Sequence, residues 1–204
     1  VHYYDRVRKE EIILNKSQLA DKWIFRKSKS IESQGKRKFG DDFNVMYPIA
    51  TLLNEAFILK KYEEHIECDK YVLVDGLKIE RSILREAVSP KSLHYLKREL
   101  LIFPYYYDES NLLMRYREDE FTQKFPETRN YLISFIKRLE ARSTGGNAKW
   151  FEYGRSQGLI HLNQKKLLMS TLVTDVIRVY HITDMQVPYA GICIYPKGGL
   201  PLEA

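Results

Sequence analysis

Residues 126–147 read Pro-Glu-Thr-Arg-Asn-Tyr-Leu-Ile-Ser-Phe-Ile-Lys-Arg-Leu-Glu-Ala-Arg-Ser-Thr-Gly-Gly-Asn, and this stretch decides the fold class. Its apolar side chains repeat with the period of an α-helix and form one stripe: Tyr131, Leu132, Phe135, Ile136 and Leu139. Pro126 suits the first turn of a helix, and the polar run Ser143–Asn147 is suited to end it. The pattern predicts a prominent helix from Glu127 to about Arg142.

Short runs with strand character lie on both sides of this helix. The Asp75-Gly76 pair supplies the positive φ values of a two-residue turn and predicts a hairpin over Tyr71–Glu80. Leu100–Phe103 indicates a buried strand, and the polar turn after Tyr107 predicts a second hairpin. Four more strand-like runs follow the helix: Lys149–Tyr153, Leu167–Thr174, Ile177–Thr183 and Gly191–Tyr195. We therefore expect an α+β fold with a mixed or antiparallel sheet and a helix pair before Gly145.

The composition excludes several classes of protein. The chain has 204 residues, 44% of them hydrophobic, which suits one substantial domain and argues against a largely disordered chain. No run approaches the roughly 18 consecutive apolar residues of a membrane span, so we expect no membrane association. Two Cys cannot by themselves make a disulfide framework or a structural zinc site.

The ends of the chain indicate a fragment. It begins Val-His-Tyr-Tyr, without a secretion signal, and it stops at Leu-Pro-Leu-Glu-Ala, without an obvious closing element. We expect a piece of a longer cytoplasmic protein, cut at both ends, so that its last domain is truncated at the C-terminus.

The charge favours an anionic partner. The formal net charge is +6, and two segments each carry a local excess of +5. Arg26–Lys38 contains six basic residues and one acid, and Lys137–Lys166 contains seven basic residues and two acids. Within the second segment, Trp150–Gln157 combines aromatic rings, a guanidinium and an amide, groups that suit phosphate contacts and base-edge reading. We expect Lys149, Arg155, Ser156 and Gln157 to contact DNA and Lys36, Arg37 and Lys38 to contact phosphates.

One motif offers a competing chemistry. Gly154-Arg155-Ser156-Gln157-Gly158 matches the nucleophile elbow of α/β hydrolases, which requires a strand, a strained turn, a helix, and then an acid followed by a His. Asp175 lies only six residues before His181, and Asp184 follows that His, so the order and spacing fit poorly. A glycine-flanked loop, with positive φ available at both ends, is the simpler interpretation.

No other catalytic or metal-binding pattern is present. The five His are scattered without metal-ligand spacing, and the sequence has neither a Walker A loop nor a Gly-x-Gly-x-x-Gly motif. We assign no catalytic residue and no metal ligand. A second alternative to DNA binding is a protein-interaction module that docks a partner through tyrosine-rich strands such as Tyr105–Tyr107.

Several blocks, in order, resemble a known family. They are Ile49-Ala-Thr-Leu52 with Ala56-Phe-Ile-Leu59, Leu101-Ile-Phe-Pro-Tyr105, Glu118–Pro126 followed by Tyr131-Leu132 and Leu139-Glu-Ala-Arg142, Trp150-Phe-Glu-Tyr-Gly-Arg-Ser-Gln-Gly-Leu159, and Tyr189-Ala-Gly-Ile-Cys-Ile-Tyr-Pro-Lys197. The set is similar to the C-terminal target-recognition (TaqI-like specificity) domain of adenine-N6 DNA methyltransferases from restriction–modification systems. Pro48 and Asn54 depart from the family pattern, which usually has Gly and Asp there.

The resemblance implies a sequence-specific module for double-stranded DNA in a two-part enzyme of type II-like restriction–modification systems. An N-terminal methyltransferase domain would bind S-adenosylmethionine and methylate adenine through an Asn/Asp-Pro-Pro-Tyr/Phe motif. This chain has no Asn-Pro-Pro, Asp-Pro-Pro or Phe-x-Gly-x-Gly sequence, so we expect no cofactor within the fragment. Residues 1–44 would be a junction after the missing catalytic domain, and residues 45–204 the recognition domain.

Overall fold

The computed structural model describes residues 2–5, 10–13, 38–65, 69–144, 146–173 and 176–198. The chain forms two compact units, residues 1–41 and residues 42–204. In the first unit, β1 (His2–Asp5) and β2 (Glu10–Ile13) pair as an antiparallel hairpin. The sequence analysis did not predict this hairpin, because its short strands lack a clear apolar alternation. Helix α1 (Phe39–Asp42) lies at the boundary of the two units.

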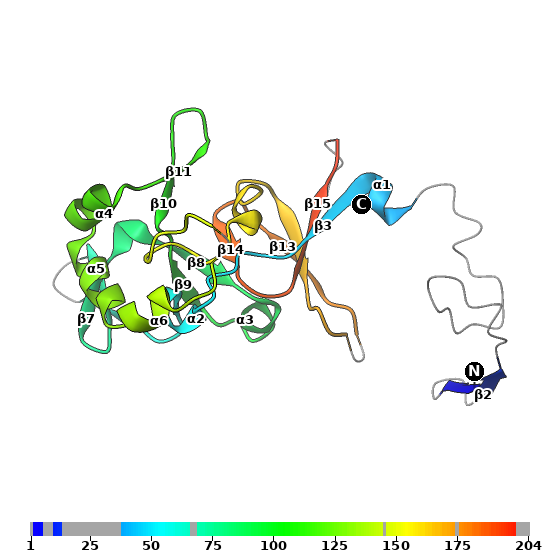
Figure 1. The fold of residues 1–204 in the computed structure, drawn as a ribbon. Coiled ribbons are helices and arrows are strands. Elements are labelled where there is room, and N and C mark those ends of the chain that lie inside the picture. The colour runs from blue at the N-terminus through cyan, green and yellow to red at the C-terminus, as the bar shows by residue number, and fades with distance from the viewer. Residues whose placement is uncertain are drawn as a thin grey trace. The chain divides into compact units, whose positions relative to one another are not determined.

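The second unit confirms the predicted α+β class (Figure 1). One four-stranded antiparallel sheet has the order β13-β12-β15-β3. Its strands are β3 (Phe43–Met46), β12 (Lys166–Met169), β13 (Val179–Ile182) and β15 (Ile192–Pro196). A second sheet has the order β14-β8-β9-β4 and is mixed, because β14 pairs in parallel with β8. Its strands are β4 (Ile58–Leu59), β8 (Leu84–Val88), β9 (Glu99–Ile102) and β14 (Gln186–Pro188).

Both predicted hairpins before the helical region are confirmed. Strands β6 (Tyr71–Val74) and β7 (Leu77–Glu80) are joined by Asp75 and Gly76, whose φ angles of 50° and 78° are those of the expected two-residue turn. A third, short strand, β5 (Glu63–Glu64), pairs with β6. The second hairpin consists of β10 (Tyr105–Tyr107) and β11 (Leu113–Arg115).

The prediction of one continuous helix from Glu127 to Arg142 is wrong, because the chain forms two shorter helices there. They are α5 (Pro126–Ile133) and α6 (Ile136–Glu140). The break falls at Ser134, whose hydroxyl donates to the carbonyl of Tyr131 at 2.6 Å. The amides of Ser134 and Phe135 bond to carbonyls only three residues back, which tightens the chain out of α-helical geometry. The other helices of the unit are α2 (Asn54–Phe57), α3 (Pro90–His94) and α4 (Glu118–Lys124), with 3₁₀ turns at Arg81–Ile83 and Gln157–Leu159.

A buried carboxylate fixes where α5 begins. Glu80, at the end of β7, accepts hydrogen bonds from the amides of Glu127 and Thr128 at 2.8 and 2.7 Å. The Thr128 hydroxyl also donates to it. Negative charge at the first turn of a helix satisfies free amides and favours the helix dipole. This contact joins the β6–β7 hairpin to the helical layer.

The second unit has two apolar cores. The larger includes Phe57, Leu101, Phe121, Leu132 and Phe151. The smaller consists of Val88, Leu168, Ile182, Cys193 and Tyr195, with Leu93 of α3 and Tyr180 packed against it. Among the residues that the structure describes, no helix is long and apolar enough to cross a membrane.

Candidate nucleic-acid interface

The segment Lys149–Tyr153 forms a tight turn, so the strand predicted there is wrong. The amide of Glu152 bonds to the carbonyl of Lys149 at 3.0 Å. Phe151, Glu152 and Tyr153 are buried in succession, whereas a strand would send neighbouring side chains to opposite faces. Phe151 stacks on Phe121 of α4 with ring centroids 4.1 Å apart. The segment is therefore a loop packed into the larger core.

Glu152 is a buried carboxylate that organises this loop. It accepts from the amide of Lys149 at 2.9 Å and from Nε of Arg115 at 2.9 Å, and the second guanidinium nitrogen of Arg115 also bonds to it. The pKa of Arg115 is raised, chiefly because its charged form donates to Glu152. The pair joins the loop to the β10–β11 hairpin, because Arg115 ends β11.

Arg142 binds four backbone carbonyls. Its guanidinium donates to the carbonyl oxygens of Leu139, Thr51, Glu152 and Trp150, at distances between 2.7 and 2.9 Å. Burial lowers its pKa from the usual value, because the charge sits away from water. The planar fork of arginine suits such multiple contacts. Arg142 thus fastens the end of α6, the loop and the segment before α2 to one another.

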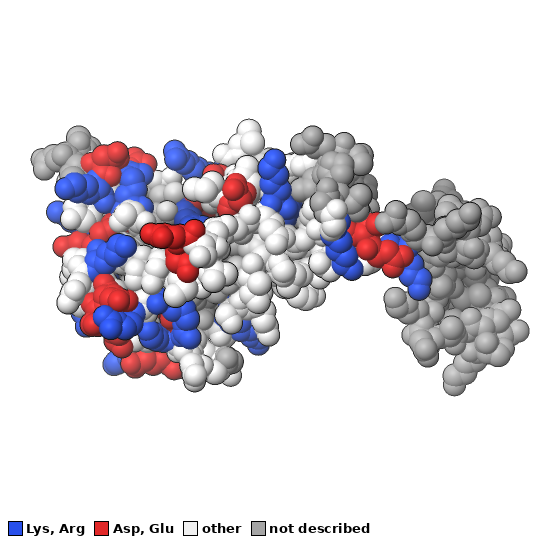
Figure 2. Space-filling model, turned by 90° about the horizontal axis from the view of Figure 1, so that it is seen from above, with Lys and Arg blue, Asp and Glu red and all other residues white. Residues whose placement is uncertain are grey.

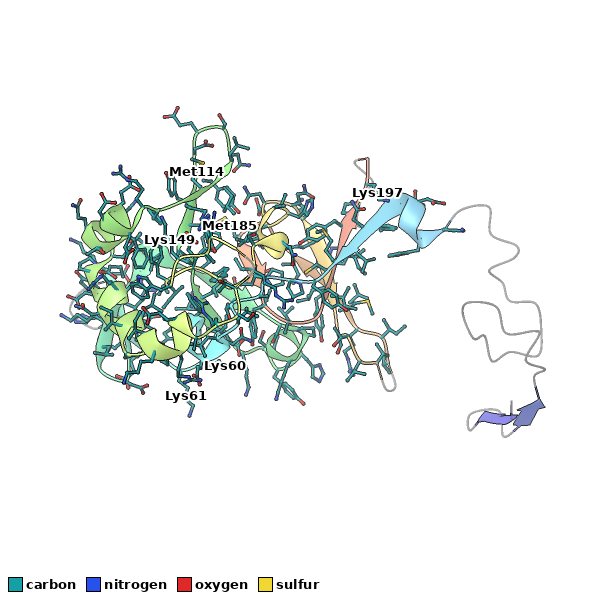
Figure 3. All side chains as sticks on the ribbon, viewed as in Figure 1. Lys60, Lys61, Met114, Lys149, Met185 and Lys197 are labelled. Atoms are coloured by element: carbon teal, nitrogen blue, oxygen red, sulfur yellow. The ribbon has the colours of Figure 1, made fainter. Side chains whose placement is uncertain are left out.

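Lys149, one of the four residues expected on DNA, is half-buried in the same scaffold. Its ammonium donates to the carbonyl of Tyr116 and lies 5.8 Å from the Phe151 ring centroid. In Figure 3 Lys149 lies among packed side chains, whereas Lys61, which is exposed, points away from the fold. The Lys149 contacts are ones that a structural lysine makes, and its role on DNA stays a prediction.

The other three predicted residues of this block, Arg155, Ser156 and Gln157, are all exposed. The amide of Arg155 bonds to the carbonyl of Ala50 at 3.1 Å, so the backbone beneath these side chains is fixed. Within the described part of the chain, the side chains of Arg155 and Gln157 make no hydrogen bond or ion pair. A fixed backbone with free polar side chains is suited to bind an external partner.

The two glycines of the block have a packing role. A Cβ on Gly158 would lie 2.7 Å from the backbone of Pro48, and one on Gly154 would overlap the Leu52 side chain. Neither glycine has a positive φ, so the expectation that they supply such angles is wrong. They are required because the loop lies directly against the segment 48–52.

Arg155 and Gln157 line a cleft of about 670 Å³. The other walls are residues 45–50, Gly158 and residues 189–191. Tyr47, at 77% exposure, is the most exposed large hydrophobic side chain of these walls. The sequence analysis missed Tyr47 and Tyr189, because nothing in a single sequence distinguishes an exposed aromatic residue from one in a core. An exposed ring, a guanidinium and an amide on one cleft are groups that suit nucleobases and phosphates.

The charge is divided unequally between the two units. Residues 1–41 contain 11 Lys or Arg and six Asp or Glu, a net charge of +5, whereas residues 42–204 contain 22 and 21, a net charge of +1. Figure 2 shows Lys and Arg atoms interspersed with Asp and Glu atoms over the second unit on the face in view. Of the predicted phosphate contacts, Lys36 and Arg37 lie outside the described residues, and Lys38 is exposed in the first unit.

Most basic side chains of the Lys137–Lys166 segment are engaged within the fold. Arg138 pairs with Glu55, and the buried ammonium of Lys166 donates to the carbonyls of Leu162, Gln164 and Thr183. Burial lowers the pKa of Lys166 to about 8. Together with Arg142 and Lys149, these contacts leave Lys137, Arg155 and Lys165 as the exposed cations of the segment without a bond to a described residue. Local net charge therefore overstates what this segment offers to a partner.

The two alternative site assignments find no supporting geometry. Ser156 lies before the short 3₁₀ turn Gln157–Leu159, where a hydrolase elbow needs a full helix, and no described His bonds to its hydroxyl. Tyr105 is buried, and Tyr106 and Tyr107 are half-buried against the larger core. No three His, Cys, Asp or Glu among the described residues are grouped to hold a metal ion.

Comparison of the chain with protein-family models finds no match, and comparison with curated protein sequences finds none either.

Proposed function

We propose that this chain is the sequence-specific double-stranded DNA recognition module of an S-adenosylmethionine-dependent adenine-N6 DNA methyltransferase from a type II-like restriction–modification system. The observation that carries the proposal is the arrangement of the Trp150–Gly158 block. Its first half is anchored by Glu152 and Arg142, and its second half presents Arg155 and Gln157, free and exposed, on a cleft. Arginine and glutamine side chains on a rigid support are the groups that read base edges.

The first unit supplies a second supporting observation. Its net charge of +5 suits the phosphate backbone, which contributes affinity without sequence preference. Lys36, Arg37 and Lys38 are the residues that we assign to phosphates. In this proposal the nearly neutral second unit reads the bases, and the positively charged first unit binds the phosphates.

Catalysis belongs, in this proposal, to an N-terminal methyltransferase domain beyond this chain. That domain would bind S-adenosylmethionine and flip the target adenine, which costs a few kcal/mol of base stacking and pairing. The recognition module offsets that cost through its contacts to neighbouring bases and phosphates. No residue of this chain is assigned a catalytic role.

The test is a fluorescence anisotropy titration of labelled duplex DNA with the folded 204-residue chain at several salt concentrations. We expect the chain to bind the duplex at low salt. The logarithm of its affinity should fall linearly with the logarithm of the salt concentration. Replacing Lys36, Arg37 and Lys38 by Ala should make that slope shallower by about 2 to 3, because each phosphate contact contributes nearly one.

A matched control removes adjacent exposed charges elsewhere. The Lys97→Ala/Arg98→Ala variant should keep the wild-type slope, since neither residue lies in the proposed contact. Absence of binding at low salt, or binding without salt dependence, would refute the proposed function.

A further inference from the structure

The hairpin that contains β12 and β13 continues past the core that it helps to form. Leu168 pairs with Tyr180, and both belong to the face that covers the smaller core. Outside the two strands, Ser170 and Leu172 on one arm and Val176 and Arg178 on the other line one groove. These side chains are not members of the smaller core, against which Leu93 of α3 packs.

These side chains and α3 enclose a groove of about 350 Å³. Its apolar walls are Leu172, Val173, Val176, Tyr180 and Tyr95. Leu172 is 82% exposed and Val176 is 56% exposed, so branched aliphatic side chains line an open surface. Grouped aliphatic side chains on the surface of a protein mark a site of contact with another apolar surface.

The charged side chains among the described residues that line the groove have a single sign. Lys91 contributes a positive charge from α3, and Arg178 contributes one from the segment before β13. None of the described residues that line the groove is Asp or Glu. An occupant that pairs with these groups is therefore negatively charged.

We propose that this groove docks a segment of a protein partner that carries aliphatic and acidic side chains. The aliphatic side chains would continue the smaller core, and the carboxylates would pair with Lys91 and Arg178. Duplex DNA fits the charge but not the branched aliphatic walls, because DNA interfaces rely on polar and basic groups. A second copy of this chain would bring like charges together across an isologous contact. This inference is independent of DNA recognition, since no described residue lines both the groove and the Arg155 cleft.

The test uses a short fluorescein-labelled peptide in which Leu and Glu alternate, titrated with the 204-residue chain. We expect it to bind, and we expect a Leu/Lys peptide and a Ser/Glu peptide of equal length to bind at least about tenfold more weakly. The Leu172→Ser/Val176→Ser variant should bind the Leu/Glu peptide about tenfold or more weakly than the wild type, because both apolar contacts are lost. Arg178→Glu should reverse the preference toward the Leu/Lys peptide.

Ile160→Ser is the matched control, because Ile160 is 75% exposed but lies outside the groove. It should bind the Leu/Glu peptide as the wild type does. Four results would overturn the proposal: no binding, equal binding of the Leu/Glu and Leu/Lys peptides, displacement of the peptide by duplex DNA, or a dimer in sedimentation that Leu172→Ser/Val176→Ser dissociates.

Discussion

The two halves of the block Trp150–Gly158 differ in what their side chains do. In the first half, Phe151, Glu152 and Tyr153 are buried and bonded, and Arg142 donates to the carbonyls of Trp150 and Glu152. In the second half, Arg155 and Gln157 are exposed, with side chains unbonded to any described residue. The difference shows that burial, and not residue type, decides which side chains of one short motif are engaged within the fold.

The largest expected effect belongs to the anchor of the first half. Arg142→Ala should lower the free energy of unfolding by about 3 to 5 kcal/mol, because four partly buried carbonyls lose a charged donor. Arg142→Lys should recover little, since one ammonium cannot reach all four. Urea denaturation measures the free energy of unfolding of both variants.

Arg138→Ala is the matched control for Arg142, four residues away. Arg138 makes an exposed ion pair with Glu55, so its loss should cost no more than about 1 kcal/mol. Equal losses for the two arginines would contradict the structural role given to Arg142.

Gly158 tests whether the loop depends on close contact with the segment 48–52. Gly158→Ala should destabilise by about 2 to 3 kcal/mol, because the new methyl group would lie 2.7 Å from the backbone of Pro48. Gly40→Ala should be neutral or slightly stabilising, since a Cβ at Gly40 meets no atom within 4 Å. Thermal denaturation separates the two, and an unaffected Gly158→Ala variant would show that the loop has room to move.

The buried Lys166 provides a pH-dependent contrast with its exposed neighbour Lys165. Burial lowers the Lys166 pKa from 10.5 to about 8, so above pH 8 the folded state loses its proton before the unfolded state does. Stability therefore rises with pH between about 8 and 10.5, by about 2 kcal/mol from pH 7 to 10, relative to Lys166→Met. Urea denaturation at a series of pH values measures this difference.

Lys165→Met should follow the wild type at every pH, because Lys165 is exposed. A Lys166→Met variant with the same pH dependence as the wild type would mean that Lys166 keeps an ordinary pKa in the fold.

The sequence predicted features that depend on neighbouring residues, and its predictions failed where other contacts decide the local structure. Asp75-Gly76 specifies its hairpin through backbone angles that few other residue pairs adopt, so no distant contact was needed. The break at Ser134 escaped detection because one hydroxyl competes for a helical carbonyl inside a good apolar stripe. The prediction of a strand at Lys149–Tyr153 was wrong because that segment folds around a hydrogen bond between Glu152 and Arg115, which lie 37 residues apart in the sequence.

The same limit applies to the candidate site. Arg155, Ser156 and Gln157 are exposed as a DNA-contacting surface requires, but the sequence does not reveal that Lys149 bonds to Tyr116 or that Lys166 is buried. Both facts depend on long-range packing. Charge counts along a chain therefore need the fold before they identify which cations remain available to a partner.

In the proposed function Arg155 serves a partner and not the fold, and one pair of measurements distinguishes these two roles. Arg155→Ala is titrated with labelled duplex DNA at two salt concentrations, beside a urea denaturation of the same sample. We predict an unfolding free energy within about 0.5 kcal/mol of the wild type and an affinity at least about fivefold weaker. Unchanged affinity in a fully stable variant would contradict the claim.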